Sequence, residues 1–165
     1  MAFATIDVTK GITGTLPVAN GGSKVGQIIQ AITDSAVNVA STSYTDTGLT
    51  INITPTATSS KILVQVNQNI LTDIDAALAN SRIQLMRDSS AVITWGANIM
   101  RIEAGGLGAV KVGNLTTFSY LDSPSTTSQI TYKTQGAVST TANNGTARFQ
   151  HASASSIITV TEILA

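Results

Sequence analysis

The sequence predicts an all-β protein: an antiparallel β-sandwich, jelly-roll-like, with an extended N-terminal arm. Charged residues make up only 11% of the chain, well below the roughly 25% of an ordinary soluble domain, so the Glu, Lys and Arg of exposed helix faces are scarce. Short apolar runs that alternate with polar residues follow one another from residue 25, separated by Ser, Thr, Asp, Gly and Pro clusters. The residues before this point lack such alternating runs, and we therefore expect them to form the extended arm.

The 165 residues fit one globular domain with an extension better than two domains. Glycines and Pro17 recur through residues 1–26 and interrupt both helix and strand, so we expect this segment to be an attachment arm or connector. Residues 27–165 are expected to form the β-sandwich head. Within the arm, four residues carry the apolar groups that would anchor it: Ile12, Leu16, Pro17 and Val18.

Alternation along the chain predicts eight or nine strands. In the clearest one, Leu49, Ile51 and Ile53 share one face and Pro55 closes the strand. The expected strands are 26–33, 47–54, 61–71, 81–88, 91–100, 113–122, 128–136, 145–151 and 156–164. Strands at these intervals predict two packed sheets, with the jelly roll as the first arrangement to consider.

Three places carry other expectations. Residues 71–82 contain an Ala-rich run and predict a helical turn or a long loop. Residues 101–113, with Gly105, Gly106 and Gly108, predict a loop that is mobile or faces a partner. Asn144 and Gly145 predict a hairpin turn, because both tolerate positive φ.

Composition excludes several function classes. Nine basic and nine acidic residues cancel, so the chain offers no electrostatic footprint for nucleic acid or an anionic membrane. The chain has no cysteine, which removes disulfides, thiolate metal sites and cysteine nucleophiles. The chain has neither the apolar run of a secretion signal nor the roughly 20 apolar residues of a membrane span, and we expect it to be made in a cytoplasm.

No motif predicts an enzyme or a cofactor. Asp73 and Asp75 form a D-x-D pair, but Ca²⁺ takes roughly 6 to 8 oxygen ligands and no acidic cluster adjoins them. His151 is the only histidine, and no G-x-S-x-G elbow accompanies it, so we interpret it as a surface or interface side chain. The glycines of 105–108 do not match a phosphate-binding loop. We predict no catalytic, cofactor-binding or metal-binding residue.

One group of residues is a candidate contact for a ligand or partner. Trp95 precedes Gly96, and an indole of this kind either packs in a core or stacks on a sugar ring or a partner. Gly105 and Gly106 lie in the glycine-rich segment that follows. These three residues are the predicted contacts.

Two stretches resemble bacteriophage virion proteins. GTLPVANGG at 14–22 resembles the connector of many tail-fibre proteins, although Ser23 and Lys24 stand where T-G commonly follows. Residues 41–66, 118–133 and 154–165 are similar to segments of phage structural proteins. The resemblance implies a virion protein of the tail-fibre or capsid cement (decoration) type, often trimeric, with a jelly-roll-like head.

The resemblance therefore predicts a short homotrimeric tail fibre that attaches through its N-terminal arm, made in the host cytoplasm and located in the virion. Its partners would be tail or baseplate proteins. A cement protein on the major capsid protein is the alternative, and a host-glycan-binding module is the second alternative. A homotrimer also agrees with the residues, because association is one way to cover an exposed apolar flank or sheet edge.

Overall fold

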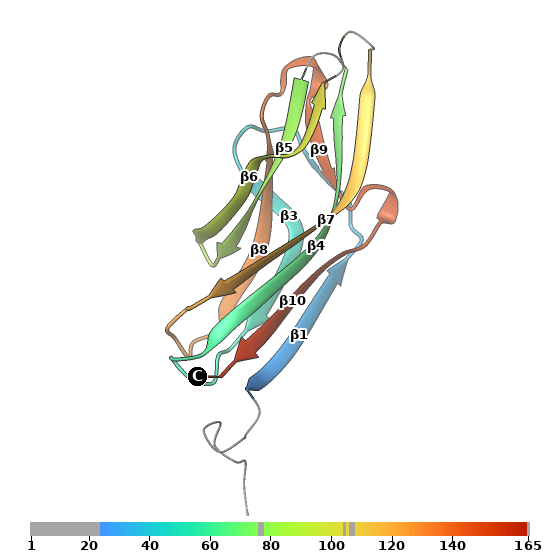
Figure 1. Cartoon of the computed structure of the whole chain (residues 1–165). Helices are drawn as coiled ribbons and strands as arrows, with labels where there is room; N and C mark the ends of the chain where they lie inside the picture. Colours follow the sequence, from blue (N-terminus) through green and yellow to red (C-terminus); the bar gives the residue numbers. More distant parts are fainter. Residues whose placement is uncertain (1–23, 76–77, 104, 106–107, 165) are drawn as a thin grey trace, which may run out of the picture.

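The computed structural model describes residues 24–75, 78–103, 105 and 108–164, and the described residues form ten strands in two antiparallel sheets (Figure 1). The strands are β1 (Val25–Thr33), β2 (Val37–Val39), β3 (Thr45–Ile53), β4 (Lys61–Ile74), β5 (Leu78–Arg87), β6 (Ser90–Glu103), β7 (Val110–Asp122), β8 (Ile130–Val138), β9 (Thr146–Phe149) and β10 (Ser156–Ile163). Two 3₁₀ turns accompany them, η2 (Ala142–Asn144) and η3 (His151–Ser153).

The first sheet, called sheet A below, is built around the long strand β4. Along one edge of β4, β10 pairs with residues 61–67 and β9 pairs with residues 70–73. β7 pairs with the opposite edge over residues 62–74. β1 extends the sheet beyond β10, and β2 extends it beyond β9. The strands β1, β10, β4 and β7 therefore form one continuous surface, which Figure 1 shows side by side.

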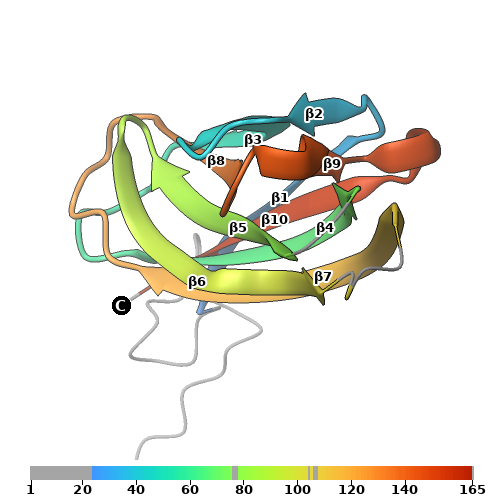
Figure 2. The same cartoon turned by 90° about the horizontal axis from the view of Figure 1, so that it is seen from above.

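The second sheet, called sheet B, has the order β3-β8-β5-β6. Across both sheets the antiparallel partners are nested: β1 pairs with β10, β3 with β8, β4 with β7 and β5 with β6. A long hairpin folded over itself gives this nesting, and with it the strand order of a jelly roll. The topology confirms the predicted all-β, jelly-roll-like sandwich. Figure 2 shows the flank on which β6 runs alongside β7.

The core lies between the sheets and follows the alternation in the sequence. Leu49, Ile51 and Ile53 of β3 are buried, as are the inward residues of β4 and β10. These residues form the main core cluster: Leu49, Ile51, Ile53, Ile62, Val64, Val66, Leu85, Ile130, Tyr132, Ile158 and Val160. A second cluster, around Ile70 and Phe149, lies beneath β2 and β9.

The close packing of the second cluster depends on a glycine. Gly136 of β8 leaves room for the ring of Phe149, which occupies the place that a Cβ on residue 136 would take. The two residues belong to different sheets, so the missing side chain sets how closely the layers approach there.

Most of the expected strands are confirmed, one strand is missed, and three expectations need correction. β2 was not predicted, because three residues are too few to show a period. The expected helical turn or long loop at 71–82 is wrong in most of its length, since β4 continues to Ile74 and β5 begins at Leu78. Within 101–113, β6 reaches Glu103 and β7 begins at Val110, so the loop is shorter than expected.

The hairpin expected at Asn144 and Gly145 is also wrong. Asn144 does have a positive φ of 57°. The turn, however, joins β8 of sheet B to β9 of sheet A, so its two flanking strands are not paired with each other. An Asn-Gly pair predicts a turn, but the turn is a hairpin only where the two flanking strands pair with each other.

The predicted arm lies almost wholly outside the described residues, which begin at Lys24. β1 starts at Val25, next to the predicted start of the head. The Leu164 amide donates a hydrogen bond of 2.8 Å to the Lys24 carbonyl, so β1 begins beside the end of β10. The arm residues Ile12, Leu16, Pro17 and Val18 and the contact residue Gly106 lie outside the described residues and stay predictions.

Candidate functional surfaces

The outward side chains of β1 and β10, of β4 from Leu63 to Leu71 and of β7 from Leu115 to Leu121 form a surface that we call the uncharged face. Register places them in rows across the sheet, such as Ile28, Thr161, Leu63 and Leu121. The members are Ile28, Gln30, Ile32, Leu63, Gln65, Asn67, Asn69, Leu71, Leu115, Thr117, Ser119, Leu121, Ile157, Thr159 and Thr161. None of these side chains carries a charge.

Four large apolar side chains of the uncharged face are open to solvent. Ile28 is 65% exposed, Ile32 60%, Leu115 56% and Leu121 47%. The polar members satisfy one another in part: Thr117 Oγ1 donates to Asn67 Oδ1 at 2.8 Å, and Gln30 Nε2 donates to Thr159 Oγ1 at 3.1 Å. The face is thus a mixture of apolar groups and neutral polar groups.

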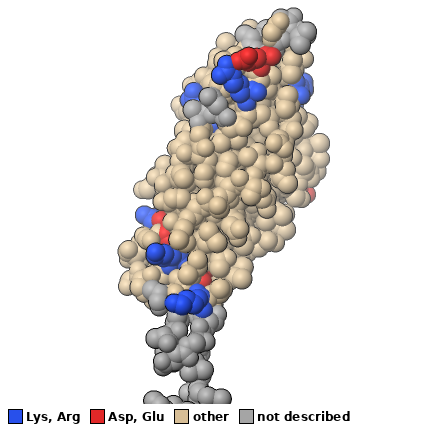
Figure 3. All heavy atoms as spheres, viewed as in Figure 1, with Lys and Arg blue, Asp and Glu red and all other residues tan. Residues whose placement is uncertain are grey.

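Charged groups gather at the two ends of the molecule in this view. Figure 3 shows a broad expanse without charged atoms between them. In the sequence the limits are clear on β4, which begins with Lys61 and carries Asp73 one residue before its end. Asp73 Oδ2 forms an ion pair with Lys111 Nζ at 3.1 Å and accepts a hydrogen bond from Arg148 Nη2 at 2.9 Å.

The outer side of sheet B differs in kind. Lys133 Nζ and Asp46 Oδ2 form an ion pair of 2.8 Å across β8 and β3, and the hydrogen bond from Lys133 lowers the pKa of Asp46. Gln135 Nε2 donates to Asp46 Oδ1 at 2.7 Å. Gln84 Nε2 donates to Gln135 Oε1 at 2.8 Å. Sheet B carries a polar, partly charged outer ladder suited to water, whereas on sheet A the charged groups lie outside the uncharged face.

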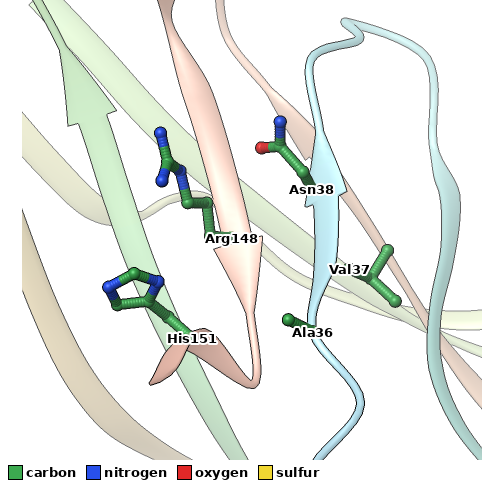
Figure 4. Close-up of a pocket in the computed structure, with 5 residues that line it drawn as sticks. All are labelled: Ala36, Val37, Asn38, Arg148 and His151. Carbon is green, nitrogen blue, oxygen red and sulfur yellow. The ribbon is translucent and has the colours of Figure 1, made fainter. Parts of the chain in front are cut away.

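A hollow of ≈ 300 Å³ opens beside β2 and β9, at the end of sheet A away from β1. Its lining residues are Ala36, Val37, Asn38, Arg148 and His151. Asn38 and Arg148 face each other in the β2–β9 register, and His151 follows in η3. Figure 4 shows the side chains of Asn38, Arg148 and His151 on one side of the two strands and that of Val37 on the other.

Arg148 is held in place by its ion pair with Asp73. Its Nε is buried and has no hydrogen-bond partner among the described residues. His151 was predicted as a surface or interface side chain, and it is half-buried at the hollow. No local pattern in the sequence signals this site, because Asn38 and Arg148 lie far apart in the chain and only strand pairing brings them together.

Trp95 lies on β6 and reaches between the layers. Its ring stacks on Phe118 of β7, with centroids 4.6 Å apart and planes at 15°, and it packs against both main core clusters. Its Nε1 is buried without a hydrogen-bond partner among the described residues. One face of the indole is therefore occupied by Phe118. Its predicted contact with a ligand or partner stays a prediction.

The other candidate positions have simpler surroundings. A Cβ at Gly105 would meet nothing within 4 Å, and its φ is +53°. Asp75 of the D-x-D pair lies beside Asn144, whose Nδ2 donates a hydrogen bond to it at 2.5 Å. Asp73 forms its ion pairs with Lys111 and Arg148. Among the described residues no group of three or more His, Asp or Glu side chains is placed to hold a metal ion. No helix in the described part of the chain is long and apolar enough to cross a membrane.

No protein-family profile matches the sequence, and no match was found among curated proteins. Several solved structures resemble the fold. The T13 viral particle of IBDV shares 12% identity at a TM-score of 0.41, over 99% of this chain and 40% of that chain. The infectious bursal disease virus Gx strain shares 15% identity at 0.38, over 84% of this chain and 38% of that chain.

The VP2 subviral particle of infectious bursal disease virus shares 12% identity at a TM-score of 0.42, over 99% of this chain and 42% of that chain. This chain spans about two fifths of the length of each of these three. At such identities and scores the likeness carries no conclusion about activity, partners or assembly.

Proposed function

We propose that this chain is a non-enzymatic structural protein of a bacteriophage virion: a short homotrimeric tail fibre attached through its N-terminal arm. The observation that carries the proposal is the uncharged face. Sheet B has a polar, ion-paired outer side, whereas sheet A presents the uncharged face with exposed Ile28, Ile32, Leu115 and Leu121, and an apolar surface of this kind is suited to being covered by a partner.

The occupants of the uncharged face are the two neighbouring copies of the same chain, with the faces of three copies meeting around a threefold axis. The flat area of the uncharged face is roughly 500 Å², from four strands spaced about 4.8 Å apart and the eight residues of β10 at about 3.3 Å each. The protruding side chains add to this area. Specific interfaces bury on the order of 800 Å² per partner, and the smallest bury less than about 600 Å². Because the face carries no charge, copies meet on it without like-charge repulsion.

The arm supplies attachment. The resemblance of residues 14–22 to phage tail-fibre connectors supports a tail or baseplate protein as its partner. The apolar groups of Ile12, Leu16, Pro17 and Val18 would lie in a groove of that partner, where burial contributes about 25 cal/mol per Å² before ordering costs. A cement protein on the major capsid protein is the alternative, and it shares both the arm and the trimer.

Deletion of residues 1–23 tests the role of the arm. The truncated chain keeps Lys24 and the whole sandwich, so we expect it to stay folded and to keep its oligomeric state while it no longer joins particles. The full chain with only its arm sequence scrambled is the matched control for length. Normal incorporation of the truncated chain would overturn attachment through the arm.

Two further measurements test the rest of the proposal. Light scattering of the purified full chain should give the mass of a trimer, and a monomer at all concentrations would overturn self-association. A labelled antibody on intact particles should mark the tail. Labelling of the head shell instead would select the cement alternative.

A further inference from the structure

We infer that the hollow formed by Asn38, Arg148 and His151 is a binding site for a small carboxylate, the acid group of a sugar acid. Three donor groups from separate parts of the chain converge there: the Asn38 amide, the Arg148 guanidinium and the His151 imidazole (Figure 4). The side chains of Asn38 and His151 form no hydrogen bond with any described residue, so their polar groups are available to a ligand.

Charge selects the ligand class. Arg148, which lines the hollow, and Lys111 both bind the carboxylate of Asp73, so this group of three side chains carries one net positive charge. A carboxylate carries one negative charge and is matched by this balance, whereas a phosphate group carries more. Because Nη2 of the guanidinium donates to Asp73 and Nε is buried, Nη1 is the nitrogen left to donate to a ligand carboxylate.

The turn that carries His151 is strained. The φ angles of Gln150, Ala152 and Ser153 are 53°, 55° and 59°, in the left-handed region that residues other than Gly rarely adopt. Such conformations persist where the surrounding structure holds them, and they gather at ligand sites.

One buried side chain holds both walls of the hollow. Gln150 is fully buried, and in the amide orientation that satisfies its partners its nitrogen donates to the carbonyls of Thr47 at 3.0 Å and Ser35 at 3.2 Å. Its oxygen then accepts from Ser156 Oγ at 2.9 Å. Ser35 precedes Ala36 on one wall, and Gln150 precedes His151 on the other. The walls are therefore fixed before a ligand arrives, which lowers the ordering cost of binding.

The size of the hollow agrees with one sugar residue. Its ≈ 300 Å³ lies at the lower end of the range of about 300–1,000 Å³ found for small-molecule sites. The hollow lies beside β2 and β9, outside the four strands that form the uncharged face. The inference concerns the single chain and does not depend on the proposed trimer.

The test is a titration of the full chain with D-glucuronate, followed by NMR of the histidine ring. His151 is the only histidine, so its imidazole gives one set of signals without assignment. We expect a saturable shift with a dissociation constant of about 1 mM and no shift with D-glucose, which lacks the carboxylate. No saturable shift up to about 20 mM glucuronate, or an equal shift with glucose, would overturn the inference.

Variants locate the site. Asn38→Ala removes an exposed group that forms no hydrogen bond with a described residue, so it leaves the fold intact, and we expect about tenfold weaker binding from the lost charge-assisted hydrogen bond. Asn114→Ala, at another exposed strand position on β7, is the matched control and should bind like the original chain. Equal binding by Asn38→Ala and Asn114→Ala would overturn the site.

A second ligand separates two sources of the carboxylate. Methyl glucuronide has its reducing end blocked, like the terminal residue of a polysaccharide. Binding of both compounds supports a terminal sugar acid of a glycan, and binding of free glucuronate alone supports a small free acid. Failure of the titration in a protein that light scattering shows to be trimeric would remove this site and leave the proposed fibre untouched.

Discussion

Tyr132 Oη donates a hydrogen bond of 2.6 Å to Asp122 Oδ2 and thereby joins the two sheets inside the sandwich. Tyr132 belongs to β8 of sheet B and is fully buried, and Asp122 ends β7 of sheet A. Arg87 Nη1 completes the group, at 3.0 and 2.8 Å from the two oxygens of Asp122. Burial and the bond to Asp122 raise the pKa of Tyr132, so its hydroxyl stays a donor.

Tyr132→Phe removes this hydrogen bond while the ring stays in the core. Asp122 keeps Arg87 and the Ser123 amide as partners, so the carboxylate is not left alone. We expect the free energy of unfolding, measured with urea, to fall by about 1–2 kcal/mol. Tyr120→Phe is the control: its hydroxyl bonds to no described residue, and it should change stability by less than about 0.5 kcal/mol. Equal effects of the two substitutions would contradict the role of the bond.

Gly136→Ala tests how tightly the sheets pack over the second core cluster. The new Cβ would meet the ring of Phe149, which has no free space to turn into because it is fully buried. Overpacking of this kind costs about 1–3 kcal/mol, which thermal or urea unfolding would detect. Gly113→Ala on β7 is the matched control, since its Cβ would approach Leu71 Cδ1 only to 3.5 Å. A stable Gly136→Ala protein would mean that the layers can separate there.

The sequence was informative where a strand is long and buried on one side. Leu49, Ile51 and Ile53 predicted both β3 and its core face, because the period of two needs no knowledge of the partner strand. β2 escaped notice because three residues show no period. The helical turn or long loop expected at 71–82 is wrong because that expectation relied on the helix propensity of the alanines and gave too little weight to the strands on either side.

The surfaces were harder to predict than the core. The uncharged face exists because the strand register places Thr161 beside Leu63 and Leu63 beside Leu121. The sequence alone does not show which strands are neighbours. The hollow depends on the pairing of Asn38 with Arg148, across more than a hundred residues of chain. Long-range pairing of this kind leaves no local pattern in a single sequence.

Glu162 makes the stability of the sandwich depend on acid. This buried carboxylate accepts from the Thr56 amide at 2.6 Å, from Thr56 Oγ1 at 2.8 Å and from Gln27 Nε2 at 2.8 Å. Burial alone would raise its pKa, but the donated hydrogen bonds outweigh burial, and the pKa of Glu162 lies below its ordinary value. Gln27 lies on β1, so the carboxylate secures the start of the head.

The sign of the effect follows from that lowered pKa. Stability is fully present above the ordinary value of 4.5 and is lost as the pH falls through it toward the lower folded pKa. We expect the urea midpoint to fall between about pH 5 and pH 3, and Glu162→Gln to flatten that part of the profile while lowering the midpoint at pH 7. Glu103→Gln, at an exposed site, is the control. An unchanged acid limb in Glu162→Gln would exclude this carboxylate as the cause.

Charges placed on the uncharged face should separate the copies. Ile28→Glu with Ile32→Glu adds two carboxylates at positions that are 65% and 60% exposed in the single chain, so the fold of each copy is retained. In an assembly on this face each carboxylate would be buried without a partner, at a cost of several kcal/mol per ion. We expect light scattering to show a monomer and circular dichroism to show an unchanged sandwich. Thr50→Glu with Thr94→Glu adds the same charge to the outer side of sheet B and should leave the trimer intact. A trimer that survives the two substitutions on β1 would place the contact elsewhere and remove the uncharged face from the proposal.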